Sequence, residues 1–230
     1  MGVTIEELVA LHPRLYHMAA DGSWPSIARH GLLSTSALLD LFEVPTDVRL
    51  ALETQRRPES ILLRHRIHGE AWVRDQKPLT DAGLLAALAS TGLTPTDWYQ
   101  LLNRRVFFWL THERLLRMLN AAPYRDRPHT VLVIETKELL NDLLNNVTLS
   151  PLNSGATRPF PWPRGPQTFQ PLATYPYETL RRRRRAQNVV VELAVEHAVE
   201  NISKYVLEIR RMRISNTLEL HNPAPLSSDI

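Results

Sequence analysis

The chain has 230 residues, of which 43% are hydrophobic and 22% charged, which is typical of a soluble globular protein. It contains no cysteine, which excludes disulfides, thiol nucleophiles and cysteine zinc sites and fits a reducing cytoplasm. The net charge of +3 permits a nucleic-acid partner without requiring one. No run is apolar enough for a transmembrane helix, and the acidic start lacks the layout of a signal peptide, so we expect a cytoplasmic protein without a membrane partner.

Apolar periodicity and capping residues divide the chain into short helices and strands. In the first half, the predicted elements are a helix over 4–12, a strand over 14–20, a helix over 24–30, helical segments to about 57 with a break at Pro45, a strand over 71–75, and helices over 80–90 and 96–104. In the second half, they are a strand over 106–110, a helix over 112–120, a strand over 130–135, a helix over 137–145, a strand over 188–195, a helical stretch over 198–204 and a strand over 205–214. This irregular alternation predicts a single α+β domain over residues 1–215 and a flexible tail over 216–230.

Residues 150–178 differ in composition from the rest of the chain because they contain seven prolines. Long irregular loops in compact domains tend to be functional. Cations and aromatic rings alternate here in a pattern that suits stacking on single-stranded bases, through Arg158, Phe160, Trp162, Arg164 and Phe169. We therefore predict a substrate-binding loop that is mobile without its acceptor. The run Arg181–Arg185 that follows either contacts phosphates or forms a solvated surface segment.

The stretch 188–195 reads Asn-Val-Val-Val-Glu-Leu-Ala-Val, which is typical of a buried strand. Glu192 stands in its middle, and a carboxylate is costly to bury without a partner or a task. Either Glu192 faces water at a sheet edge, or it points into a cleft and works there. Glu135 is a competitor on another apolar strand, but it occupies the last position, where exposure to solvent is easy.

Several familiar sites are absent from the sequence. It has no Gly-x-Gly-x-x-Gly fingerprint, no phosphate-binding Gly-Lys-Ser/Thr loop and no Gly-x-Ser-x-Gly elbow. His65 and His68 have ligand spacing on a predicted helix, but two histidines alone are a weak metal signal. We therefore predict no metal site.

Three segments, in their order along the chain, resemble proteins of the ADP-ribosyltransferase fold. Leu15-Tyr16-His17-Met18-Ala19, followed by a helix and Gly31-Leu32-Leu33-Ser34, resembles the opening of that superfamily. The aromatic strand Arg105-Val106-Phe107-Phe108-Trp109 resembles a strand of the DarT-type toxins, which ADP-ribosylate DNA. The Glu192 strand comes last, after a long variable loop, as the catalytic strand does in that family. The resemblance implies a split β-sheet core with flanking helices.

The resemblance also implies an activity, which is transfer of ADP-ribose from NAD to an acceptor, with nucleic acid as the first choice. It implies Glu192 as the catalytic carboxylate, with Arg74 as the best candidate for the toxins' arginine and a surface charge pair beside Asp75 as the alternative. The residues expected to bind NAD are His17, Met18 and Ser34 near the sugar and amide groups, and Phe107 or Phe108 under the nicotinamide. Met18 departs from the family, where many members have Gly or Thr. A toxin of this type would be expected to have an antitoxin partner.

Two other functions remain open from the sequence. An RNA 2′-phosphotransferase would need a set of arginines around its phosphate, and the sequence does not place them. A catalytically inactive module of the same fold would bind a nucleotide and release nothing. The NAD-dependent reading requires His17 and Glu192 to line one cleft on the same side of the sheet.

Overall fold

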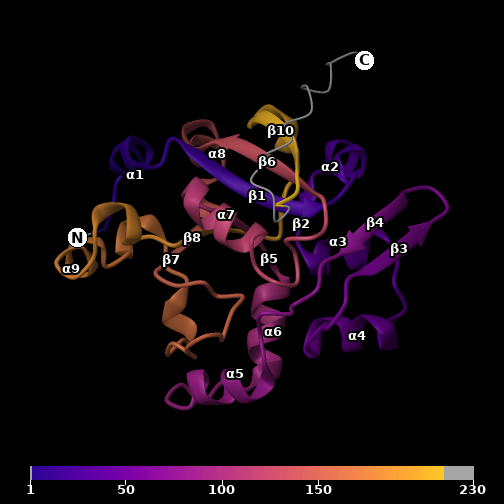
Figure 1. Ribbon diagram of the computed structural model, residues 1–230, viewed down its shortest axis with the longest axis horizontal. Helices are drawn as coiled ribbons and strands as arrows, with labels where there is room; N and C mark the ends of the chain where they lie inside the picture. The colour runs from indigo at the N-terminus through magenta and orange to yellow at the C-terminus, as the bar shows by residue number, and fades with distance from the viewer. Residues whose placement is uncertain (1, 215–230) are drawn as a thin grey trace.

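A computed structural model describes residues 2–214 of the chain. Its centre is a six-stranded sheet in which every neighbouring pair is antiparallel (Figure 1). In sheet order the strands are β10 (Val206–Met212), β6 (His129–Glu135), β1 (Arg14–Ala20), β5 (Arg105–Trp109), β8 (Glu192–Glu196) and β7 (Val147–Ser150). Helices flank this sheet, so the predicted α+β class is confirmed.

Short helices and two small ribbons surround the sheet. The helices are α1 (Ile5–Leu11), α2 (Trp24–His30), α3 (Thr35–Leu41), α4 (Thr46–Thr54), α5 (Asp81–Leu88), α6 (Pro95–Asn103), α7 (His112–Leu119), α8 (Thr136–Leu143) and α9 (Tyr177–Arg181). The ribbons pair β2 (Leu32–Leu33) with β9 (Ala198–Val199), and β3 (Ile61–His65) with β4 (Gly69–Val73). Within the described residues, no helix is both long and apolar enough to cross a membrane.

Local signals set several helix boundaries. The hydroxyls of Thr80, Thr94 and Thr111 each accept a hydrogen bond from a backbone N–H in the first turn of α5, α6 and α7. Gly31 ends α2 with a φ of 85°, and a Cβ there would lie 2.8 Å from the Glu200 Cα. Only glycine fits this position, which holds α2 and β2 close to the segment that contains β9.

The two faces of the sheet are both covered. On one face, side chains such as Phe108 and Leu193 form the main core with α1, α2 and α8. On the other face, α7 packs near β1 and β6, while α5 and α6 pack against Phe107 and Ala194. Glu192 belongs to this second face, because it pairs directly with Trp109.

The ladder between β1 and β5 opens after a single described pair, Tyr16 with Trp109. The following residues of β1 and the preceding residues of β5 are not paired with each other, so these two neighbouring strands diverge. Helix α3 and the β3–β4 ribbon lie on the side of the sheet where β1 and β5 diverge (Figure 1). A cavity lies in this opening, and the candidate site described below is built around it.

Some predicted elements are corrected. His65 ends β3 and His68 lies in the following turn, so neither is on a helix. The strand predicted over 188–195 begins only at Glu192, and the helix predicted over 198–204 is replaced by β9 and a 3₁₀ turn, Ile202–Lys204. Strands β2, β3, β7 and β9 were not predicted, because short apolar runs do not reveal their type by periodicity. The tail predicted over 216–230 lies outside the described residues.

Candidate functional site

His17 lies where β1 and β5 diverge. Its Nδ1 is 2.9 Å from the carbonyl oxygen of Phe107 on β5. A carbonyl only accepts hydrogen bonds, so Nδ1 carries the proton and Nε2 keeps its lone pair. Burial lowers the pKa of His17 to about 4, which keeps the ring neutral. His17 can therefore accept a hydrogen bond from a ligand hydroxyl.

Glu192 begins β8 between Trp109 of β5 and Ser150 of β7. Its side chain is buried, with 3% of the residue exposed. The backbone N–H of Ser154 donates to its Oε2 at 3.0 Å. Burial raises the pKa of Glu192 to about 7, against the lowering effects of Ser154 and of the nearby Arg164 and Arg114. The alternative of an edge glutamate facing water is thereby excluded.

His17 and Glu192 line two adjoining cavities. The first, here the β1–β5 cavity, has a volume of about 210 Å³ and is lined by His17, Ser34 and the start of β5. The second, here the Glu192 cavity, has a volume of about 220 Å³ and includes Asn153, Ser154 and Glu192. Both cavities share the same dividing residues, which are Thr35, Arg74, Arg105 and Phe107.

The expectation of one cleft on one face is corrected by the strand register. Tyr16, Trp109 and Glu192 are consecutive partners across three strands, so their side chains share a face. His17 follows Tyr16 and belongs to the opposite face, where its ring lies 5.8 Å from that of Phe108. The two candidates therefore approach each other only through the opening of the sheet, past Phe107 and Arg74.

Arg74 directly follows β4 and lines the β1–β5 cavity, the Glu192 cavity and a third cavity beside Tyr124. Its guanidinium lies 5.6 Å from the centre of the Tyr124 ring, and Nη1 is 3.5 Å from Nδ1 of His129. The neighbouring Asp75 instead accepts hydrogen bonds from Tyr124 and from Ser60. Within the described residues Arg74 has no ion-pair partner, so the exposed charge pair proposed as its alternative is not formed.

Among the other residues expected to bind NAD, Ser34 and Phe107 line the β1–β5 cavity. Ser34 accepts a hydrogen bond from the Ala37 N–H at the start of α3, which leaves its own hydroxyl proton available. Phe108 is excluded as the stacking ring because it is buried in the main core. The Met18 side chain packs in the cluster under α7, so only its backbone remains a candidate for contact with NAD.

The loop residues divide into a buried and an exposed group. Arg164 and Phe169 are only 4% and 8% exposed. The prediction that these two residues contact the acceptor is therefore wrong. Phe169 stacks on Trp98, 6.0 Å between ring centres. Arg158 is exposed, and Phe160 and Trp162 are each 64% exposed with their rings 6.3 Å apart. Only this tip of the loop can present rings to a partner.

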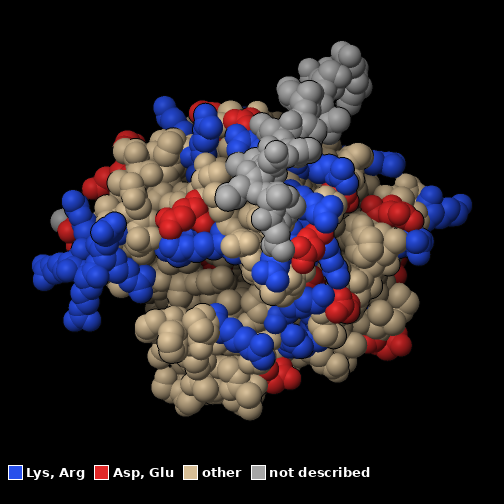
Figure 2. Space-filling view, in the orientation of Figure 1, with Lys and Arg blue, Asp and Glu red and all other residues tan. Residues whose placement is uncertain are grey.

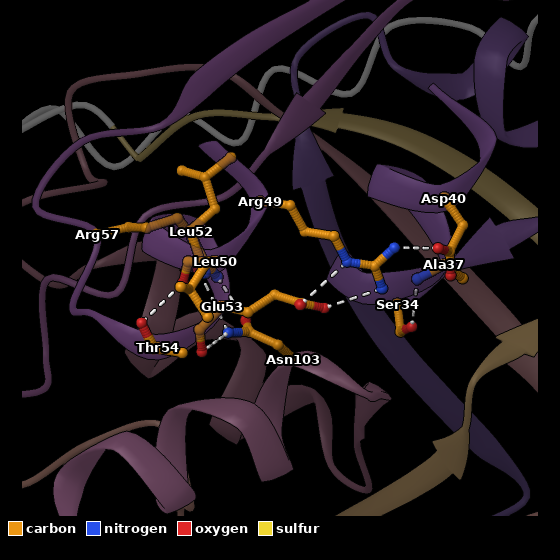
Figure 3. Close-up of polar contacts among 10 residues, drawn as sticks. All are labelled: Ser34, Ala37, Asp40, Arg49, Leu50, Leu52, Glu53, Thr54, Arg57 and Asn103. Atoms are coloured by element: carbon orange, nitrogen blue, oxygen red, sulfur yellow. Dashed lines mark hydrogen bonds and ion pairs between the residues drawn. The ribbon is translucent and has the colours of Figure 1, made fainter. Parts of the chain in front are cut away.

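Sequence reasoning missed a buried arginine in the wall of the Glu192 cavity. Arg57 donates to the carbonyls of Leu52 and Arg74 and to the Asn103 amide oxygen. Asn103 in turn donates to the Glu53 carbonyl at the end of α4 (Figure 3). Burial lowers the pKa of Arg57 to about 10. No sequence signal marked this residue, because its partners are backbone carbonyls and an amide from distant segments.

Arg105 was also missed, although strand alternation places it on the same face as Phe107. It forms an ion pair with Glu196 at 2.8 Å and lies 5.0 Å from the Phe169 ring. The buried Nε atom of Arg105 has no hydrogen-bond partner among the described residues. Alternation from Phe107 was the signal that could have identified it.

Residues 13–206 match DUF7002, which is described as a family of unknown function. This segment is most of the chain, and it contains every candidate residue named above from His17 to Glu192, so the protein belongs to DUF7002. No curated protein and no solved structure matches the chain.

Proposed function

We propose that this protein is an NAD-dependent ADP-ribosyltransferase of the ADP-ribosyltransferase fold. The register places His17 and Glu192 on opposite faces, so the single cleft that this function required is not formed, and the proposal depends instead on the opening between β1 and β5. The observation that carries it is the burial of Glu192 in a cavity that meets the His17 cavity at Phe107 and Arg74. A carboxylate is not kept in such a place for stability, because burial opposes its charge. The neutral imidazole of His17 and the free hydroxyl proton of Ser34 suit the hydroxyl and amide groups of a dinucleotide.

The proposed reaction breaks the bond between the ribose C1′ and the nicotinamide nitrogen, and nicotinamide leaves with the bonding electrons. Positive charge develops on the ribose, as in glycoside hydrolysis. Ionised Glu192 hydrogen-bonds a ribose hydroxyl and stabilises that charge, while the ring of Phe107 stacks on the nicotinamide. The acceptor then bonds to C1′ and gives its proton to a base. If Glu192 is also the base that takes this proton, that second role would increase the rate by about 10²–10⁴-fold.

We further propose nucleic acid as the acceptor. The exposed rings of Phe160 and Trp162 offer stacking surfaces of the kind that bind unpaired bases. The five arginines Arg181–Arg185 are all exposed, and Figure 2 shows a cluster of basic side chains that protrudes at the position of α9. Such a cluster suits phosphate groups. A toxin role and an antitoxin partner remain predictions of the family resemblance.

Glu192→Gln tests the proposal, because it keeps the size of the side chain and removes its charge. Release of labelled nicotinamide from NAD should fall by about 100-fold or more, while the NAD dissociation constant changes little. The assay is run with single-stranded DNA, RNA and cell lysate as acceptors. Glu200→Gln, an exposed residue just after β9, is the matched control and should keep wild-type activity.

The same assay separates an enzyme from a binding module. If wild type and Glu192→Gln both bind NAD and neither releases nicotinamide, the protein only recognises a nucleotide. Equal turnover by the two proteins would refute Glu192 as the catalytic carboxylate.

A further inference from the structure

A buried arginine is linked to Glu192 through the backbone of one residue of the proline-rich loop. Arg164 Nη1 donates to the carbonyl oxygen of Ser154 at 3.0 Å. The N–H of the same residue, Ser154, donates to Glu192 Oε2, also at 3.0 Å. The two charged groups therefore lie on the two sides of Ser154, and its N–H can stay on the carboxylate only while the loop keeps this shape.

The shape of the loop depends on the fork of the Arg164 guanidinium. Besides Ser154, it donates from Nη2 to the Ala156 carbonyl at 2.8 Å and from Nε to the Trp162 carbonyl at 3.1 Å. It also lies 5.6 Å from the centre of the Trp98 ring, and the Trp98 indole N–H donates to the same Ser154 carbonyl at 3.2 Å. Lysine cannot reproduce three such bonds from one planar group.

Arg164 forms no ion pair with a carboxylate within the described residues, since its hydrogen bonds all end on neutral carbonyls. A buried cation without a counter-ion is expensive, and apolar residues would fill the space at lower cost. Its charge is therefore expected to have a task in the site, and the nearest buried carboxylate on the other side of Ser154 is Glu192.

We propose that Arg164 is a positioning residue, which holds the backbone of Ser154 so that its N–H stays on the Glu192 carboxylate, and which favours the ionised form of that carboxylate by its charge. The importance of this form for a reaction rests on the proposed function, but the linkage itself does not. The charged groups that face Glu192 are Arg164 from the loop and Arg114 from α7, and the same cavity is lined by Arg57, Arg74, Asp75 and Arg105. Arg164 is the one joined to Glu192 through Ser154.

The test measures ionisation of Glu192 directly, without NAD. The side-chain carboxyl carbon is followed by ¹³C NMR against pH, and its signal is identified by its absence from Glu192→Gln. In Arg164→Met, the midpoint should move to higher pH by about 1 unit or more, because a favourable charge and a fixed N–H are lost together. Arg164→Lys should give a smaller shift in the same direction, since it keeps the charge and loses the fork.

Thr157→Val is the matched control from the same buried loop. Thr157 Oγ1 accepts a hydrogen bond from the Thr80 N–H at 3.0 Å, and the Thr157 side chain forms no hydrogen bond with Ser154 or Glu192. The titration midpoint of Glu192 in Thr157→Val should equal that in the wild type. If Arg164→Met does not fold, Trp98→Phe replaces it, because it removes the second donor to the Ser154 carbonyl without changing any charge and should give a small upward shift.

An unchanged midpoint in folded Arg164→Met, or an equal shift in Thr157→Val, overturns the proposal. Nicotinamide release is measured in parallel over the same pH range, and its alkaline rise should move with the midpoint. If the wild type releases no nicotinamide, the proposed function fails, while the NMR midpoints still decide the role of Arg164.

Discussion

Glu192→Gln should make the stability of the protein less dependent on pH. In the wild type, the folded-state pKa of Glu192 is about 7, above its ordinary value of 4.5, because burial opposes the charge. The unfolded chain therefore releases this proton at a lower pH than the folded protein does. The stability associated with protonated Glu192 is complete below pH 4.5 and is lost as the pH rises to about 7.

The size of the effect follows from the two pKa values. They differ by about 2.5, and each unit corresponds to about 1.4 kcal/mol, so the wild type should lose about 3 kcal/mol relative to Glu192→Gln between pH 4.5 and pH 7. Above pH 7 the difference should stay constant. For a domain of this size, it corresponds to a change of about 6–12 °C in the difference between the two melting temperatures.

The assay is urea denaturation of both proteins at intervals from pH 4.5 to 8. All other titrating groups are common to the two proteins, so they cancel in the difference. Glu200→Gln provides the same chemical change at an exposed position and should follow the wild type at every pH. Parallel stability curves for wild type and Glu192→Gln would refute the view that the folded protein opposes this charge.

Two further predictions concern the aromatic strand and the arginine cluster. Phe107→Ala should weaken NAD binding with a modest loss of stability, whereas Phe108→Ala should lower the free energy of unfolding by about 3–5 kcal/mol, as seen by isothermal titration and urea denaturation. Replacing Arg182, Arg183 and Arg185 by alanine should reduce the salt slope of single-stranded DNA binding by about 2, measured by fluorescence anisotropy. Equal NAD affinity in both phenylalanine variants, or an unchanged slope, would contradict these assignments.

Much of the fold could be predicted where the signals are local. The strand that became β1, the cap at Thr80 and the stop at Gly31 each follow from a few neighbouring residues. The strand β7 was not predictable in this way, because Val147–Ser150 is short and is defined by its pairing with β8. The order of strands in the sheet likewise depends on contacts between distant segments.

The candidate site shows the same division. Glu192 could be selected because a carboxylate is unusual in the middle of an apolar strand, whereas His17 and Arg74 were selected through the resemblance to the ADP-ribosyltransferase fold. The orientation of Phe107 and Phe108 could not be chosen, because alternation fixes only that they oppose each other. Arg164 was assigned to the acceptor because it alternates with aromatic residues, but three backbone carbonyls that only the folded loop brings together hold it inside.

The proposed function needs the two cavities to hold one ligand although their key residues lie on opposite faces, and the separation of β1 and β5 after the Tyr16–Trp109 pair provides the opening for it. At neutral pH His17 is uncharged, and Glu192 is only partly ionised near its pKa of about 7. The walls shared by the cavities contain Arg74 and Arg105, of which only Arg105 has a carboxylate partner among the described residues. Among the residues shared by the two cavities, Arg74 therefore contributes a positive charge without an ion-pair partner within the described residues. In the proposed complex with NAD, this charge would favour the anionic part of the ligand at the junction, with the sugar on His17 and the reacting bond toward Glu192.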